Sequence, residues 1–308
     1  MTIDIIPFKF FPIPEKRGND WQSHMMAPSA YFDGSKITVF FGARDYDGIS
    51  RIRSLVIHNL SDFSYSVNSK IVLDVGMPGT FDDNGVFPGS VIVDGSQVLL
   101  SYTGFELSSK IPHYNFNGLA VYDSLNQVAH RINYFPILDR SDEGLYVRAG
   151  MSAIRNIQGT WDIFYSAGSS FELIENKMRP NYDIYSQTNI QDLTEIPPKG
   201  NRILEYRKLT EHGLGRPQII RWQNDLYLFY TIRRKNFPYR FGIAKKSTKS
   251  DEFQRLDDKI VFHDNGNTNY SQMAYFPAPL VINNRLFIFL NGNDFGRTGI
   301  AICEVHFH

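Results

Sequence analysis

Arginine, carboxylate and amide side chains recur in this 308-residue sequence where short apolar segments begin or end. Arginine binds carboxylate and phosphate groups through paired hydrogen bonds, and a carboxylate can take a proton from a hydroxyl group. The candidates for proton transfer are Asp45, Asp83 and Glu211. The candidates for ligand binding are His24, Arg44, Asp82, Glu143, Arg148, His212, Arg216, Arg233, Tyr270, Asn291 and Asn293. Such a set suits a sugar, which needs paired hydrogen bonds to its hydroxyl groups and flat apolar faces to stack on.

Several of these residues also have a simpler structural interpretation. Arg44 and Asp45 could pair with each other across a turn, and Asp82 and Asp83 could cap the turn before Gly85. The remaining histidines have no metal-ligand spacing, and we expect surface or structural roles for His58, His113, His130, His263, His306 and His308. The glycine motifs that bind nucleotide phosphates are absent as well. We therefore predict neither a metal nor a cofactor.

A repeated pattern indicates how these side chains come together. Five segments share a small or proline-containing start, a short apolar strand, a tight turn and a second apolar-aromatic strand. The segments begin at Ala27, Phe87, Ala149, Arg216 and Pro277, with spacings of 60, 62, 67 and 61 residues. Their turns are predicted at Asp33-Gly34, Asp94-Gly95, Gln158-Gly159, Asn224-Asp225 and Asn283-Asn284.

Each segment is followed by a third strand, and a fourth strand precedes the next segment. The fifth unit lacks a fourth strand, and the N-terminal stretch IDIIPFKFFPI can supply it. We predict an all-β chain in which residues 1–308 form one five-bladed β-propeller with four antiparallel strands per blade. Pairing of the N-terminal strand with the last blade would close the ring and remove the exposed strand edges. A β-sandwich or barrel is the alternative, but neither requires a regular period of this length.

Composition excludes several partners. The chain has 32 basic and 32 acidic residues, and this balance argues against nucleic-acid binding. Its one cysteine, Cys303, rules out a disulfide framework within the chain. No run of about 18 apolar residues could span a membrane, and the N-terminus does not resemble a secretory signal. We therefore expect a cytoplasmic protein; the sequence does not indicate its oligomeric state.

Three segments carry a resemblance to known proteins. FDDNGVFPGSVIVDGSQVLLSYTG (81–104) resembles the second-blade motif of invertase and fructosidase glycosidases. GRPQIIRWQNDLYLFYTIR with YRFGIAKKS, and YFPAPLVINNRLFIFLNGNDFGRTGIA (275–301), resemble the fourth and fifth blades of relatives of the family 43 glycosidases. The chain is thus similar to the arabinanase–levansucrase–invertase superfamily of five-bladed propellers, without a match to one member family. The resemblance implies a carbohydrate ligand in the axial cleft, and relatives of this kind include proteins of surface-polysaccharide metabolism.

The departures from that superfamily concern its three catalytic carboxylates. The resemblance implies an aspartate before a proline in blade one, but Ala27 precedes Pro28. It implies an aspartate after arginine in blade three, but Ala149 follows Arg148. It implies a glutamate two residues before the blade-four proline, where Gly215 stands. Two carboxylates flank the bond in most glycoside hydrolases, so the hydrolytic mechanism cannot be carried over unchanged.

Three functions remain open. The first is glycosyl transfer or phosphorolysis with a phosphorylated or nucleotide sugar, favoured by convergence of Arg44, Arg148, Arg216 and Arg233 on one end of the channel. Asp45 or an acid near Asp83 would then act as base. The second is glycoside hydrolysis with relocated carboxylates, for which Asp45, Asp83 and Glu211 are candidates. The third is a propeller that binds carbohydrate without catalysis.

Overall fold

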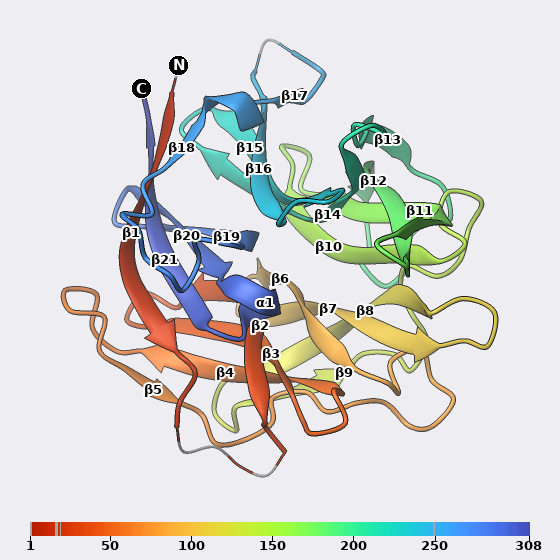
Figure 1. The fold of residues 1–308 in the computed structure, drawn as a ribbon, viewed down its shortest axis with the longest axis horizontal. Coiled ribbons are helices and arrows are strands. Elements are labelled where there is room, and N and C mark those ends of the chain that lie inside the picture. Colours follow the sequence, from red (N-terminus) through yellow and green to blue (C-terminus); the bar gives the residue numbers. More distant parts are fainter. Residues whose placement is uncertain (1, 16–17, 19, 249) are drawn as a thin grey trace.

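The computed structural model describes residues 2–15, 18, 20–248 and 250–308, and β-strands make up most of its regular structure. The strands lie around a common centre (Figure 1). The antiparallel pairing of consecutive strands divides them into five groups, of which groups 2, 3 and 4 are joined into one sheet by short parallel pairings. Within the described residues, the helical elements are η1 (Asp257–Lys259) and α1 (Asn293–Gly296). None of the helices in that part of the chain is long and apolar enough to cross a membrane. The all-β prediction is confirmed.

Consecutive strands pair antiparallel within each group. Group 1 consists of β2 (Ser23–Phe32), β3 (Ile37–Arg44), β4 (Ser50–Ile57) and β5 (Tyr65–Val67). Group 2 consists of β6 (Val86–Asp94), β7 (Gln97–Leu107), β8 (His113–Asp123) and β9 (Val128–Arg131). Group 3 consists of β10 (Val147–Arg155), β11 (Trp161–Ile174), β12 (Lys177–Ile190) and β13 (Asn201–Leu204). Group 4 consists of β14 (Glu211–Trp222), β15 (Asp225–Arg234), β16 (Arg240–Lys246) and β17 (Gln254–Arg255).

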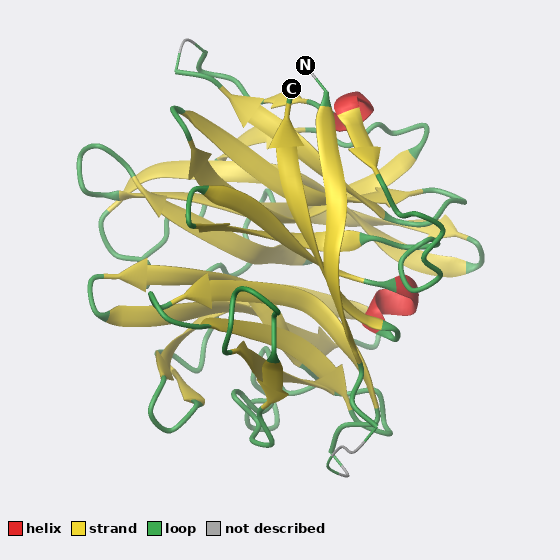
Figure 2. Ribbon diagram, turned by 90° about the vertical axis from the view of Figure 1, so that its left-hand side faces the viewer, coloured by secondary structure: helices red, strands yellow, loops and turns green. Residues whose placement is uncertain are grey.

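Group 5 joins the two ends of the chain. It contains β19 (Tyr275–Ile282), β20 (Arg285–Asn291) and β21 (Gly299–Phe307), and β21 pairs antiparallel with the N-terminal strand β1 (Ile3–Pro12). A short strand, β18 (Ile260–Phe262), pairs parallel with the other edge of β1. Figure 2 shows the two chain ends side by side.

Two of the predicted hairpin turns are displaced by one residue. Asp94 pairs with Gln97 at the end of β6, so the turn between β6 and β7 begins one residue later than predicted. Asp225 already belongs to β15 and pairs with Trp222, so that turn begins one residue earlier. The cause is the same at both places. Aspartate favours turns, but here Asp94 and Asp225 each take part in the strand pairing, so each belongs to a strand and not to the turn.

The apolar core is divided among the contacts between groups. Five buried clusters each combine side chains from two neighbouring groups, in the order 1–2, 2–3, 3–4, 4–5 and 5–1. The inner strands of the groups are β2, β6, β10, β14 and β19. Each contacts the next, and β19 contacts β2. Burial of apolar faces between neighbouring sheets therefore arranges the groups around the centre.

Every inner strand carries a β-bulge near its start, where its pairing with the following strand shifts register. In four of these strands the bulge includes a residue with positive φ: Ala27, Gly150, Arg216 and Phe276. Three of the four are not glycine, so this conformation costs free energy that other contacts must offset. Bulges re-aim side chains and backbone groups. Here they turn these segments toward the centre.

Side chains from the preceding group satisfy the amides of these bulges. The Arg216 amide donates to Ser166 Oγ at 3.0 Å, and the Phe276 amide donates to Thr231 Oγ1 at 3.0 Å. The Gly150 amide donates to Thr103 Oγ1 at 3.2 Å. The Ala27 amide donates to Asn291 Oδ1 at 3.1 Å. Each acceptor lies in the second strand of its group, so one recurring hydrogen bond links neighbouring groups at the bulge.

The Arg216 side chain links β14 to three other inner strands. Its Nε donates to the Pro88 carbonyl of β6 at 2.9 Å, and its Nη1 donates to the carbonyls of Phe276 and Pro277 in β19 at 3.3 and 3.4 Å. Its Nη2 donates to the carbonyls of Ala27 and Pro28 and to Ser29 Oγ, all in β2. On the remaining inner strand, β10, a Cβ added to Gly150 would lie 2.9 Å from the Arg216 Cα. Arg216 therefore touches or closely approaches every other inner strand.

Replacing Arg216 with methionine should strongly destabilise the fold. The variant keeps an unbranched side chain but leaves several buried carbonyls without a donor, and each unsatisfied group costs roughly 1–3 kcal/mol. We expect the free energy of unfolding, measured by chemical denaturation, to fall by about 3 kcal/mol or more. Arg155→Met is the matched control, because Arg155 is about half exposed and pairs with Asp94 at 2.8 Å. Equal losses in the two variants would contradict a central role for Arg216.

Candidate functional site

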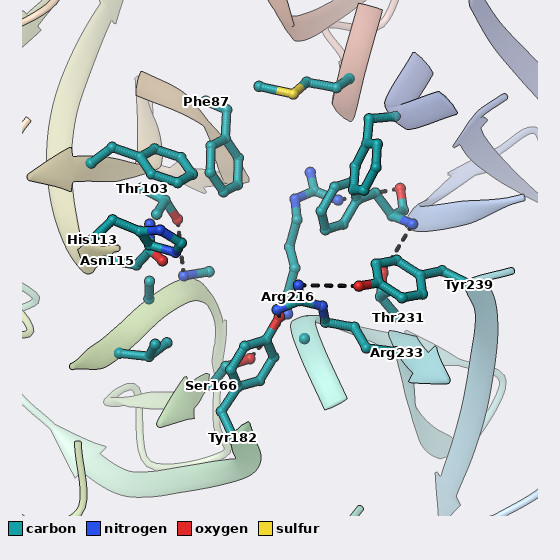
Figure 3. A pocket seen from close by; sticks show the side chains of 18 of the residues that line it. Phe87, Thr103, His113, Asn115, Ser166, Tyr182, Arg216, Thr231, Arg233 and Tyr239 are labelled. Carbon is teal, nitrogen blue, oxygen red and sulfur yellow. Dashed lines mark hydrogen bonds between the residues drawn. The ribbon is translucent and has the colours of Figure 1, made fainter. Parts of the chain in front are cut away.

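A pocket of about 330 Å³ lies at the centre of the five groups, and all five contribute residues to its lining (Figure 3). Four arginines and one histidine line it: Arg44, Arg179, Arg216, Arg233 and His113. None of the lining residues, all within the described part of the chain, is an aspartate or a glutamate. The pocket is therefore positively charged.

Strand ends position the polar side chains of the pocket. Arg44 is the last residue of β3, and Arg233 lies next to the end of β15. His113 begins β8, and Arg179 lies near the beginning of β12. Tyr239 directly precedes β16. Because these ends meet on one side of the central bulges, residues far apart in sequence face one space.

Two tyrosines hold the Arg233 guanidinium. Its Nη1 donates to Tyr182 Oη at 2.7 Å, and its Nη2 donates to Tyr239 Oη at 3.2 Å. The guanidinium carbon lies 5.3 and 5.2 Å from the centroids of the same two rings, within cation–π range. Burial alone would lower the pKa of Arg233, but the two tyrosines raise it above its usual value. Arg233 therefore stays charged although its recorded partners are neutral hydroxyl groups.

His212 supports this arrangement from behind the pocket. Its Nδ1 lies 3.3 Å from the Pro180 carbonyl oxygen, and its Nε2 lies 3.2 Å from Tyr239 Oη. A carbonyl oxygen only accepts, so Nδ1 carries the hydrogen and Nε2 accepts a hydrogen bond from Tyr239. The Tyr239 oxygen is then left to accept from Arg233. His212 thus fixes the direction of this bond.

Two donors at the pocket have no partner in the described part of the chain. These are the Nε of Arg44 and the Nδ2 of Asn115, both buried. Burial lowers the pKa of Arg44, and the carboxylate of Asp294, which lies outside the lining, opposes that effect only in part. Buried donors normally find an acceptor. Both groups are therefore suited to bind an acceptor atom of a ligand.

Of the residues that sequence analysis proposed, Arg44, Arg216 and Arg233 line the pocket. Arg148 does not, because its guanidinium turns to the Asp139 carbonyl at 2.7 Å and to Glu143 at 3.1 Å. The four arginines were expected to meet at one end of the channel, and the structure brings three of them there.

The proposed proton-transfer residues lie outside the pocket lining. Asp45 forms an ion pair with Arg51 at 2.6 Å rather than with its neighbour in sequence, Arg44. Asp83 accepts hydrogen bonds from the Gly79 amide and from Asn84 within a turn. Glu211 accepts two hydrogen bonds from Arg255, at 3.0 and 2.7 Å. Their role in proton transfer stays a prediction, and these contacts show what each carboxylate does in the structure.

The other proposed ligand-binding residues are also held by the protein. Asp82 pairs with Arg131 at 2.8 Å, and Glu143 accepts from Tyr165 Oη at 2.6 Å. Tyr270 packs in the core between groups 4 and 5, while His24, Asn291 and Asn293 are buried beside the backbone of groups 1 and 5. Their side chains are not part of the pocket lining.

Several pocket residues that were not predicted from the sequence lie in the third strands or directly before them. His113 was expected to be structural or at the surface, but it lines the pocket together with Asn115. Arg179, Tyr182 and Tyr239 were not singled out. The common signal is a polar or aromatic residue at the beginning of a third strand, a position that sequence analysis used only to define the repeat.

The buried His24 and His212 and the half-buried His113 are neutral at pH 7. Burial and the nearby Arg233 lower the pKa of His113 to about 4 and that of His212 to about 3. Burial and Arg44 lower the pKa of His24 to about 4. At neutral pH the arginines, and not the histidines, supply the positive charge of the pocket.

These shifts predict how stability depends on pH. The ordinary histidine pKa is 6.5, so between pH 6.5 and about 4 the unfolded chain binds more protons than the folded chain. The free energy of unfolding should therefore fall as the pH is lowered through this window. His113→Gln should flatten the dependence when unfolding is measured by denaturant at several pH values. His130→Gln, which changes an exposed histidine, is the control; an equal effect of both would contradict the prediction.

Comparisons with known proteins extend this description. No protein-family profile matches the chain. An uncharacterised protein of Mycobacterium tuberculosis strain H37Rv is 21% identical over 293 residues, which cover 92% of this chain and 93% of that protein. A solved glycoside hydrolase is similar with a TM-score of 0.70 and 15% identity, covering 98% of this chain and 92% of the other. A thermostable family-43 glycoside hydrolase is similar with a TM-score of 0.65 and 16% identity, covering 96% and 93%. The chain has the fold of these five-bladed propeller glycoside hydrolases, as the sequence motifs predicted.

Proposed function

We propose that the chain is a propeller of five four-stranded blades, closed into a ring by β1, whose central pocket binds a sugar that carries negative charge. We propose that it acts in glycosyl transfer or phosphorolysis, with a phosphorylated or nucleotide sugar as substrate, in surface-polysaccharide metabolism. One observation carries the proposal. The described lining of the pocket has four arginines and no carboxylate.

An anion is the partner that this lining lacks. A buried guanidinium without a counter-charge costs free energy, and a bound anion would offset that cost. Arg148, outside the pocket, already has Glu143 beside it at 3.1 Å. Arg44 and Arg233 have no such acid among the lining residues. Arginine also suits the planar or tetrahedral oxygens of carboxylate and phosphate, because its donors are arranged as a fork.

Aromatic rings support a sugar as the rest of the ligand. Phe87 lies between Phe105 and Phe276 in the lining, with ring centroids 5.3 and 6.1 Å away. Flat apolar surfaces beside a few fixed polar groups are typical of small-molecule sites, and a sugar ring has one face rich in C–H groups. The combination of these rings with the arginines supports a charged sugar over a free inorganic anion.

Glycoside hydrolysis is the second candidate, and the fold likeness favours it. Most glycoside hydrolases need two carboxylates at the scissile bond. Asp45 and Glu211 would have to leave their ion pairs with Arg51 and Arg255 to serve there. Hydrolysis therefore requires these ion pairs to break, whereas binding of an anion by the arginines does not. In transfer or phosphorolysis, the arginines would stabilise the phosphate charge at the reacting bond.

A thermal-shift assay tests the ligand class. Inorganic phosphate, sugar phosphates and nucleotide sugars should raise the melting temperature, whereas neutral oligosaccharides should not. A ligand at about 100 times its dissociation constant adds roughly 2.7 kcal/mol to the free energy of unfolding. Arg44→Met should reduce the shift, and Asp45→Asn at the adjacent position should leave it unchanged. A shift with neutral sugars alone would contradict the proposal.

A reducing-sugar assay tests the reaction class. Without phosphate or a nucleotide sugar, we expect the protein to release no reducing sugar from a broad panel of oligosaccharides. Release that is lost in Asp45→Asn or Glu211→Gln, with folding intact, would replace our proposal with hydrolysis. Ligand binding without turnover of any donor would instead identify a non-catalytic binding protein.

A further inference from the structure

The arginines of the pocket differ in how many of their donors the protein already uses. All three guanidinium nitrogens of Arg216 donate to oxygens of β2, β6 and β19. An arginine has five N–H donors, and these contacts occupy the Arg216 fork. Arg216 is therefore a structural residue at the floor of the pocket, although sequence analysis proposed it as a ligand-binding residue.

The position of Arg216 also limits the path of a ligand. Its guanidinium extends from β14 to carbonyls of three other inner strands, so it crosses the centre of the molecule beneath the pocket. Figure 3 shows Arg216 between His113 on one side and Arg233 on the other. A ligand would therefore approach from the side where the strand ends meet.

Arg179 and Arg233 act on the same part of the pocket. Both line the pocket together with His113, and both contribute to lowering the pKa of His113 and of His212. Arg179 is only half-buried, and Arg233 binds neutral tyrosine hydroxyl groups. Positive charge from β12 and β15 therefore faces the same pocket as the neutral imidazole of His113 from β8. This is the place in the pocket that would gain most from an anion.

The size of the pocket limits the rest of the ligand. Sites for drug-sized molecules span roughly 300–1,000 Å³. At about 330 Å³ this pocket is at the lower end of that range. One sugar ring with one charged substituent is a suitable occupant, whereas a complete nucleotide sugar would have to extend far outside.

We infer that the pocket takes one sugar unit, free or at the end of a chain, and holds its single phosphate or carboxylate group between Arg179 and Arg233. This inference rests on the proposed function and narrows it in two ways. It identifies the anion-binding arginines, and it limits the part of the ligand inside the pocket to one terminal sugar unit with its charged group, so that any nucleotide would lie outside the pocket.

Isothermal titration calorimetry on the full chain tests the inference. The probes are inorganic phosphate, glucose 1-phosphate, galacturonate, glucose, trigalacturonate and uridine diphosphate glucose. The variants are Arg179→Met, with a half-buried side chain, and Arg155→Met as a surface control. Unchanged melting temperatures would show that both variants fold. Loss of one charge-assisted interaction corresponds to about tenfold weaker binding or more.

The expected result is that glucose 1-phosphate or galacturonate binds, about tenfold or more weakly to Arg179→Met and unchanged to Arg155→Met. The two probes distinguish a phosphate from a carboxylate substituent. If no anionic probe binds the unaltered protein, the proposed function fails together with the inference. If an anionic probe binds Arg179→Met as it binds Arg155→Met, the assigned subsite is wrong and the proposed function stands. Binding of trigalacturonate or uridine diphosphate glucose more than about tenfold tighter than the single-unit probes would overturn the one-unit limit.

Discussion

The Arg216 guanidinium is the interaction on which the centre of this protein depends. Five inner strands approach each other with their bulges turned inward, and bulged backbone leaves carbonyl groups without strand partners. Arg216 supplies donors for carbonyls of Ala27, Pro88 and Phe276, which are 60 to 189 residues away in sequence. Burial lowers the pKa of Arg216 to about 9, which still leaves the side chain charged at neutral pH. One side chain thus supplies hydrogen-bond donors to the inner strands of three other groups.

The same constraint explains why several polar residues near the centre are structural. Ser166, Thr231, Thr103 and Asn291 each accept a hydrogen bond from a bulge amide of the next group. From the sequence alone, their hydroxyl and amide groups could equally form hydrogen bonds with a ligand. In the structure they keep the bulges in place, and the bulges in turn form the inner wall of the pocket.

Charge is separated between the pocket and its surroundings. The carboxylates near the centre, such as Asp82 and Glu211, are paired with arginines outside the lining. Among the arginines of the lining, Arg216 donates to carbonyls and Arg233 to tyrosines, and the Nε of Arg44 has no hydrogen-bond partner among the described residues. A fold shared with glycoside hydrolases can therefore present a site whose charge is opposite to that of a carboxylate pair. One fold supports different chemistry when the side chains at the strand ends change.

By itself, the sequence determined the features that depend on local pattern. Alternating apolar residues, turn dipeptides and a spacing of 60 to 67 residues predicted an all-β repeat, and the turns lie within one residue of their predicted positions. The absence of carboxylates at Ala27, Ala149 and Gly215 was also visible in the sequence. Only the tertiary structure decided which polar residues face the pocket. Asp45 forms an ion pair with Arg51, Glu211 forms one with Arg255, and Arg216 donates to backbone carbonyls. Most of these partners are distant in sequence, so the sequence alone does not show which partner binds each charged side chain. His113, Arg179 and Tyr239 line the pocket because they lie at or near the start of strands that begin near the centre of the five groups, and no local pattern specifies that position.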